Sequence, residues 1–324
     1  MIDYLIEHPG GQTLSGLRCL AIDVIGRAGY GQKQVWSPEL QDHKGKDARF
    51  VYFKTISLVA DRFEWAVFVP TKLLKMPFVP RQLQSLGRHK ERMPAYTERV
   101  LEEERHASRA GYSSRNNFPN DDEISGNLFI ISTAGFETTA NTMGYAVMHL
   151  AAFPEWQAWV RGEVCNLDPD MLQWKYDEIF PRCHRTLALM FETLRLYTPT
   201  LHSTRYIAEP QRLATSDDDH LLMPPMDIYV AFQAIHCDLD IWGPGMLECN
   251  PSRWIDAAGM KMSQVEFVAF FVALFRYARC EPFGQEELEV LQEGLRRMMR
   301  DSVQRLTLQV RDSKSVKLRW VPDT

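Results

Sequence analysis

The sequence predicts an α-rich α+β fold, built as one domain over residues 1–324, and three observations lead to this prediction. Residues 1–199 consist mainly of stretches with helical periodicity. Short β-type runs between turn residues begin at Thr200 and continue to Val230. The C-terminal part, 200–324, mixes strand, coil and helix, so we expect a small β-sheet on that side of a mainly helical domain.

Proline, glycine or a polar loop interrupts most of the apolar stretches and sets the ends of the predicted helices. The predicted helical segments are 14–25, 51–69, 82–109, 123–152, 155–165, 176–197, 260–277 and 286–300. The first of them is expected to stop at the glycine-rich run that begins at Gly26. Segments 303–310 and 316–321 alternate in polarity, and we expect them to pair as a hairpin.

The segment 123–152 is predicted to be the long central helix. At ~1.5 Å per residue it would be about 45 Å long. Asp121 and Asp122 precede it and offer N-cap chemistry and favourable charge for the helix dipole. Because apolar residues occur on all its sides, this helix is expected to be mostly buried.

The overall composition is that of a soluble globular protein, with 45% hydrophobic and 24% charged residues. A net charge of −5 and a pI near 6.0 give no reason to expect nucleic acid as a partner. The N-terminus lacks the basic and then apolar run of a signal peptide, and the apolar stretch 267–275 is too short for a bilayer, which takes ~20 residues. The chain as written is therefore expected to be soluble. Its six scattered cysteines form no Cys-x-x-Cys pair and are expected to be reduced thiols.

A first candidate site lies in the central helix, in Ala134-Gly135-Phe136-Glu137-Thr138-Thr139. Ala134, Gly135 and Thr138 share one helical face, so two minimal side chains lie beside a hydroxyl and leave room for a flat macrocycle. The Thr138 hydroxyl could then bond dioxygen, and Glu137 could supply protons as a general acid. The alternative is that the small residues serve only a close contact between helices.

A second candidate is Glu192-x-x-Arg195 in an unusually apolar helix. Charges in such a setting must be paired, because an isolated buried charge is very costly. Arg253, in Asn250-Pro251-Ser252-Arg253-Trp254, is the natural third member. The alternative is an ordinary surface pair, since Glu and Arg three positions apart are common on exposed helices.

In this order and spacing the motifs resemble those of the cytochrome P-450 family of haem-thiolate monooxygenases. The resemblance implies a truncated P-450-like fold that begins in mid-fold, most like fungal members. It implies haem as cofactor, an NADPH-dependent reductase as electron donor, and insertion of one oxygen atom of dioxygen into an apolar small molecule. Full-length members like it are anchored in the endoplasmic-reticulum membrane.

The same resemblance assigns roles to individual residues. It makes Glu137 and Thr138 catalytic, and it places Ala134 and Gly135 against the haem. Arg205, in Leu201-His202-Ser203-Thr204-Arg205, would bind a haem propionate by charge pairing. Glu192, Arg195 and Arg253 would form the family's structural triad.

The chain departs from the family at the haem-ligand loop, whose pattern is Phe-x-x-Gly-x-Arg-x-Cys-x-Gly. Here Trp254 is followed at once by Ile255-Asp256-Ala257-Ala258-Gly259, and Ala257 occupies the position of the cysteine. Alanine cannot ligate iron, and no cysteine lies between Cys249 and Cys280. We therefore expect no metal ligand and no catalytic turnover from the chain as written.

Other functions are compatible with this departure. One is a non-catalytic remnant without cofactor, and another is a helical protein that binds an apolar ligand or a partner without haem. A metal-dependent prenyl-phosphate enzyme is suggested by Asp121-Asp122-Glu123, but the second carboxylate cluster it needs is absent. The His236-Cys237-Asp238 run has no partner at metal-ligand spacing and predicts no metal site.

Overall fold

The computed structural model of the chain describes residues 1–30, 36, 55–56, 58–59, 62–108, 121–168, 170, 174–215, 217–256, 259–260, 275, 278–304 and 307–322. The α-helices are α1 (Ile2–Glu7), α2 (Thr13–Tyr30), α4 (Phe63–Phe68), α5 (Thr71–Leu74), α6 (Arg81–Ser108), α7 (Asp121–Ala152), α8 (Pro154–Val164), α9 (Tyr176–Ile179), α10 (His184–Leu196), α11 (Phe232–His236), α12 (Leu239–Trp242) and α14 (Leu288–Arg300). Short 3-10 turns are η2 (Phe180–Arg182), η3 (Pro251–Trp254) and η4 (Ser313–Ser315). The α-rich α+β fold class is confirmed.

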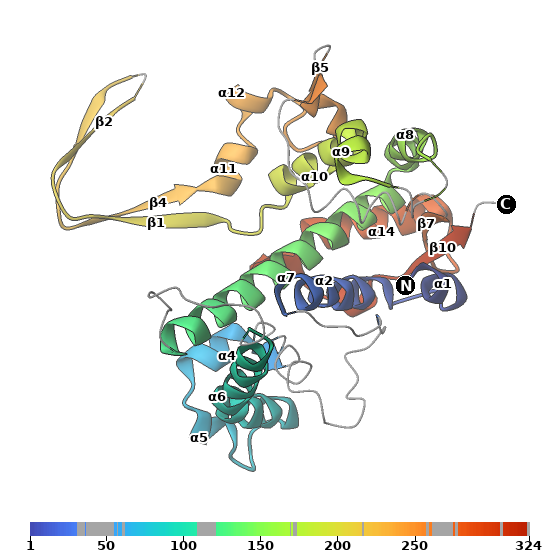
Figure 1. The fold of residues 1–324 in the computed structure, drawn as a ribbon. Helices are drawn as coiled ribbons and strands as arrows, with labels where there is room; N and C mark the ends of the chain where they lie inside the picture. The colour runs from blue at the N-terminus through green and yellow to red at the C-terminus, as the bar shows by residue number, and fades with distance from the viewer. Residues whose placement is uncertain are drawn as a thin grey trace.

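Helix α7 is the long central helix, and it was predicted almost to the residue. It begins at Asp121, so the two aspartates form its first turn and do not precede it. Helices α2, α10 and α14 pack on it (Figure 1). Its last third is fully buried, with exposures of 0–3% from Met143 to Ala152 for the hydrophobic residues. The expectation of a mostly buried helix therefore holds for this C-terminal part, whereas nearer the N-terminal end Ile130 and Ile131 are 63% and 60% exposed.

Helix α2 does not stop at Gly26 as the sequence predicted, but continues to Tyr30. An interior glycine costs a helix only about 1 kcal/mol relative to alanine. Burial of Leu17, Ala21 and Ile22 in the main core outweighs that cost.

The predicted helix 176–197 is broken. Residues Phe180–Arg182 form a 3-10 turn, because Pro181 has no N–H to donate to the helix. Helix α10 then starts at His184, and Glu163 of α8 accepts bonds from the backbone N–H groups of Arg185 (2.8 Å) and Thr186 (3.2 Å). Ten of its thirteen residues are buried, so α10 is a core helix.

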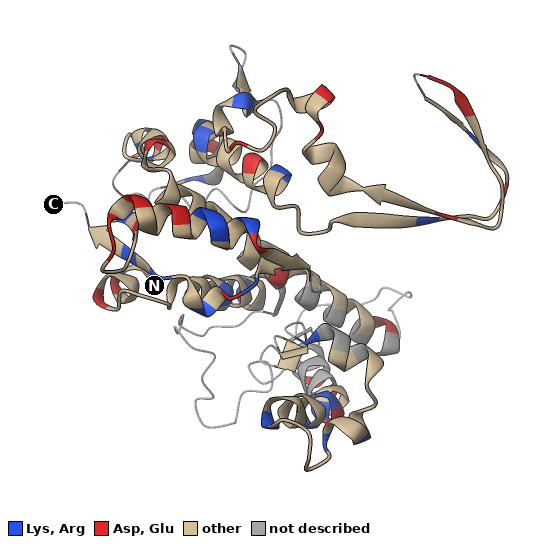
Figure 2. Cartoon of the chain, turned by 180° about the vertical axis from the view of Figure 1, so that it is seen from behind, with Lys and Arg blue, Asp and Glu red and all other residues tan. Residues whose placement is uncertain are grey.

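The β-type runs between Thr200 and Val230 were expected to form short strands, and the four strands found in this region form one long ribbon. Strand β1 (His202–Ile207) pairs antiparallel with β4 (Met226–Ala231), and β2 (Gln211–Ala214) pairs with β3 (Asp219–Leu222). Figure 1 shows this ribbon extending away from the helices. Figure 2 shows acidic residues near its tip, where the sequence has Asp217, Asp218 and Asp219.

The predicted hairpin between 303–310 and 316–321 is wrong. The first segment folds on itself, with β8 (Ser302–Gln304) paired to β9 (Leu308–Val310). The second becomes β10 (Leu318–Pro322) and pairs with β7 (Ala278–Pro282). Alternating polarity identifies a strand but does not determine which strand it pairs with. Cys280 of β7 and Trp320 of β10 lie opposite each other in the pair, and both side chains are buried.

The remaining segments complete the body of the protein. Helices α4, α5 and α6 enclose a small second core of Val59, Ala66, Leu74, Leu83 and Leu86. The short strands β5 (Ile255–Asp256) and β6 (Gly259–Met260) pair antiparallel over two residues each. Most of the predicted helix 260–277 and most of the segment 51–62 lie outside the described residues, and Met260, where that helix was predicted to begin, is in β6. Within the described part of the chain, no helix combines the length and apolarity needed to cross a membrane.

Candidate functional site

The residues of the α7 motif lie on three different sides of the helix. Ala134 is exposed and Thr138 is half-exposed, so they form a strip that a ligand could reach. The Thr138 hydroxyl donates to the carbonyl of Ala134 at 2.7 Å, which uses its only proton within the helix. To donate to a ligand, this hydroxyl would have to rotate away from that carbonyl.

Gly135 faces helix α2. A Cβ placed on it would lie 2.9 Å from Cδ1 of Ile25, closer than ordinary packing allows. The glycine therefore permits the close approach of α2 and α7. For this residue the alternative of a helix-packing contact describes the structure better than an open hollow does.

Glu137 lies on a third side, and its carboxylate is buried, with 2% of its side chain exposed. One oxygen accepts from Nη2 of Arg18 at 3.0 Å, and the other accepts from Nε2 of Gln309 at 3.1 Å. The Arg18 guanidinium also lies over the Phe136 ring at 5.5 Å. Sequence patterns did not point to Arg18 and Gln309 as partners, because they are 119 and 172 residues away along the chain.

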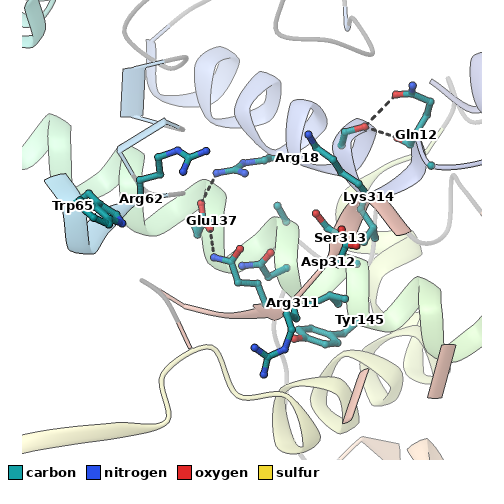
Figure 3. Close-up of a pocket in the computed structure, with 18 residues that line it drawn as sticks. Gln12, Arg18, Arg62, Trp65, Glu137, Tyr145, Arg311, Asp312, Ser313 and Lys314 are labelled. Carbon is teal, nitrogen blue, oxygen red and sulfur yellow. Dashed lines mark hydrogen bonds and ion pairs between the residues drawn. The ribbon is translucent and has the colours of Figure 1, made fainter. Parts of the chain in front are cut away.

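A cavity of about 990 Å³ adjoins this carboxylate, as Figure 3 shows. Helix α7 lines it with Glu137, Ala140, Asn141, Gly144 and Tyr145. Gly135 and Thr138 were expected to face the main cavity beside this helix, but they are not among the residues that line this one. At 100° per helical residue, Gly135 is turned away from this side of α7, whereas Thr138 is only about 20° around the helix from Tyr145.

The second candidate, the group of Glu192, Arg195 and Arg253, comes together as expected. Arg195 forms two bonds to the Glu192 carboxylate, from Nη2 at 2.8 Å and from Nε at 3.0 Å. Arg253 adds a third from Nε at 3.1 Å. The exposed side-chain fractions are 0% for Glu192, 1% for Arg195 and 17% for Arg253.

Further groups complete this network. Glu192 also accepts from the backbone N–H of Asn250 at 2.9 Å and from Nε1 of Trp254 at 3.0 Å. Arg195 donates to the carbonyls of His236 (2.9 Å), Met246 (2.5 Å) and Glu248 (3.2 Å). A bidentate pair with this many additional bonds is the geometry in which a buried charge is tolerated. The network links α10 to the coil that follows α12. Glu192, Arg195 and Arg253 are not among the residues that line the cavity beside α7.

Trp242 is a member of this group that sequence reasoning missed. Its ring lies 4.9 Å from the Arg195 guanidinium and 5.9 Å from that of Arg253. Nothing in the sequence around Trp242 indicated a cation–π contact with an arginine on another helix.

Arg205 lies on β1 in the exposed ribbon. In the part of the chain that the structure describes, it donates to Oγ of Ser203 at 2.7 Å and to the carbonyl of Thr204 at 3.1 Å. These bonds are local, so the guanidinium is accessible to an anion. The structure does not bring it into contact with the α7 motif.

Three of the cysteines, Cys183, Cys249 and Cys280, occupy settings that oppose ionisation. Burial raises the pKa of Cys183 to about 12 and raises those of Cys249 and Cys280 as well, and Glu192 raises the pKa of Cys249 further. Cys237 accepts a bond from Nε2 of Gln233. Ala257, at the position of the expected ligand, lies outside the described residues. Among the described residues no group of three or more His, Cys, Asp or Glu is arranged around a common point as a metal would require.

Comparison with known proteins agrees with the motifs. A family model described as cytochrome P450 matches residues 14–271. The chain is 29% identical over 237 residues to the phomenoic acid biosynthesis cluster cytochrome P450 monooxygenase of Leptosphaeria maculans, a match covering 59% of this chain and 40% of that protein. It is 28% identical over 296 residues to cytochrome P450 714B3 of Zea mays, covering 85% of this chain and 50% of that protein. The chain thus spans half or less of the length of these relatives.

A solved structure shares the fold. The crystal structure of a cytochrome P450 (CYP102L1) matches 100% of this chain and 74% of its own chain, with a TM-score of 0.74 and 18% sequence identity. At that identity the match concerns the fold alone.

Proposed function

This chain belongs to the cytochrome P450 family, and from that membership we propose that it keeps the family's scaffold but does not by itself support haem-thiolate monooxygenation. The family's chemistry is oxidation at a haem, whose thiolate ligand promotes cleavage of the O–O bond. The observation that carries the proposal is the absence of a suitable thiol in the sequence, where Ala257 replaces the ligand.

The residues that would lie on the face of the haem where dioxygen binds fit that role in part. Ala134 and Thr138 form an accessible strip on α7. Glu137, in contrast, is held by Arg18 and Gln309 and not by Thr138. A proton relay through Glu137 would first require that ion pair to open.

The cysteines of the chain do not fit the role of the thiolate that binds the haem iron. A thiolate ligand is favoured by an electropositive and partly exposed setting. Cys183, Cys249 and Cys280 have raised pKa values, because burial disfavours their charged form. Cys165 is exposed, but it caps the far end of α8. We therefore derive no catalytic step for this chain.

The remaining roles stay part of the proposal at the level of the family. Ala134 would border the haem, Gly135 would instead keep the close contact with Ile25 of α2, and Arg205 would pair with a propionate. An NADPH-dependent reductase and an apolar small-molecule substrate belong to a family member that holds its iron. Glu192, Arg195 and Arg253 would act as a folding element, since their bonds are to one another and to backbone carbonyls.

A reconstitution experiment tests the proposal. The purified chain is incubated with hemin, freed of excess, reduced, and its absorption spectrum recorded with and without carbon monoxide. We expect no thiolate-type Soret band. Such a band from the unaltered chain would refute the proposal, and Cys165→Ser, Cys237→Ser and Cys249→Ser variants would then identify the sulfur that binds iron.

Ala257→Cys is the matched gain-of-function variant. A thiolate-type band from this variant alone would show that the scaffold still accepts haem and that only the sulfur is lacking. Its failure, with the unaltered chain also negative, would show that the shortened loop lacks more than the cysteine.

The apolar-ligand alternative is not favoured by the cavity. Its walls carry Arg18, Arg62, Glu137 and Asp312, so a purely apolar molecule would have to strip water from charged groups without replacing their contacts.

A further inference from the structure

The cavity beside α7 is a polar chamber built by four separate parts of the chain. Its walls are formed by the start of α2 with the residues just before it, by Arg62 and Trp65, by the middle of α7, and by the segment from Gln309 to Lys314. Figure 3 shows Arg62 and Trp65 at one end and Ser313 and Lys314 at the other. Ala134 and Thr138 do not line it, so it is separate from the strip discussed above.

Positive charge dominates the walls of this cavity. Arg18 and Glu137 neutralise each other, and Glu137 has both oxygens engaged. Beyond that pair, Arg62, Arg311 and Lys314 face a single carboxylate, that of Asp312. The cavity therefore has an excess of cations that its own walls do not balance.

The contacts of these three cations leave them able to bind a ligand. Arg62 donates to the neutral amide oxygen of Gln82 at 2.6 Å. Arg311 is 3.6 Å from Asp301, but both side chains are more than 60% exposed, and such pairs contribute little. Lys314 makes no hydrogen bond or ion pair within the described residues.

An aromatic surface lies at the other end. Trp65 leaves 47% of its surface exposed, which is unusual for so large an apolar ring in a monomer and offers a face for stacking. A volume of about 990 Å³ accommodates a molecule of drug-like size or larger.

We propose that this cavity binds an organic oxyanion, a carboxylate or a phosphate carried on an aromatic body. The acid group pairs with Lys314, and Arg311 adds positive charge from another side of the cavity (Figure 3). The ring lies toward Trp65, next to the positive charge of Arg62. Binding does not depend on haem, because no residue of the strip takes part.

Calorimetric titration with three matched naphthalene compounds tests the proposal. 1-Naphthaleneacetate carries a carboxylate, 1-naphthyl phosphate carries a phosphate, and 2-(1-naphthyl)ethanol is the neutral counterpart. At least one anion should bind about tenfold more tightly than the alcohol, as expected for a charge-assisted contact. Whichever anion binds more tightly identifies the preferred headgroup.

Variants locate the site. Arg311→Gln combined with Lys314→Gln should weaken binding of the preferred anion about tenfold. Trp65→Ala should weaken binding of all compounds that bind measurably. Lys317→Gln is the matched control, since Lys317 is exposed, lies three residues beyond Lys314 and does not line the cavity, and it should leave the affinity unchanged.

Three results would overturn the proposal. They are equal affinity for the alcohol and the anions, no saturable binding of either anion, and a loss in Lys317→Gln as large as in the double variant. The substituted residues are exposed, so the unfolding midpoints of the variants should match that of the parent. Matching midpoints show that a loss of binding comes from the site and not from unfolding.

Discussion

Replacing Glu192 by Gln should destabilise the protein more than a substitution of this size normally does. The carboxylate is fully buried and accepts five hydrogen bonds from Arg195, Arg253, Asn250 and Trp254. An amide at this position keeps one acceptor oxygen, but its NH₂ group must face at least two of the present donors. It also removes the negative charge that balances Arg195, whose side chain is 1% exposed.

The magnitude follows from these contacts. Two buried donors left without acceptors cost ~1–3 kcal/mol each. Removing one partner of a buried ion pair costs about 3–5 kcal/mol in the free energy of unfolding, and this is our expectation for Glu192→Gln. Since a typical domain is stable by about 5–15 kcal/mol, the loss is a large part of the total.

Urea unfolding at pH 7, followed by tryptophan fluorescence, measures this loss. Glu281→Gln is the control, because Glu281 pairs with Arg319 at 2.8 Å while both side chains are partly exposed, and its loss should stay below about 1 kcal/mol. If Glu192→Gln does not fold, Glu192→Asp keeps the charge and should show a smaller but measurable loss. Equal losses for Glu192→Gln and Glu281→Gln would refute the reasoning.

Three further predictions concern the core. Burial lowers the pKa of His149 to about 3, and neither ring nitrogen has a partner among the described residues. In the unfolded chain His149 has a pKa near ~6.5, so below that pH the unfolded state binds a proton that the folded state does not bind. The free energy of unfolding should therefore fall as the pH drops below 6.5, by ~2 kcal/mol at pH 5. Urea titrations at pH 7.5 and pH 5 measure this loss, and the His149→Leu variant should not show it. Gly135→Val should force Ile25 and α2 away from α7 and cost ~1–3 kcal/mol, and a variant as stable as the parent in thermal unfolding would contradict the close contact. Gln157→Leu removes bonds to the carbonyls of Leu150 and Cys280 and to the N–H of Cys280, so amide exchange at Cys280 should accelerate strongly while exchange in the β1–β4 ribbon stays unchanged.

The candidate sites divide according to how local their contacts are. Glu192 and Arg195 lie three residues apart on one helix, so periodicity alone brought them to the same face and the apolar setting predicted their pairing. Arg253 was placed with them by the family resemblance. Glu137 gave no such local signal, and its partners Arg18 and Gln309 came from helix α2 and from the C-terminal strands.

Gly135 illustrates an ambiguity that the sequence could not resolve. A small residue on a helix allows the close approach of a flat ligand or of another helix, and both uses need the same absence of a side chain. Only the packing of Ile25 against it selected the second.

The sequence by itself determined the α-rich fold class and the extent of α7, because helical periodicity is a property of single segments. The tertiary structure decided that β10 pairs with β7, that α2 continues past Gly26, and that Arg311 and Lys314 meet Arg62 and Trp65 around one cavity. These outcomes depend on which distant segments come to lie side by side. That choice is governed by the burial of the whole core, and no short stretch of sequence encodes it.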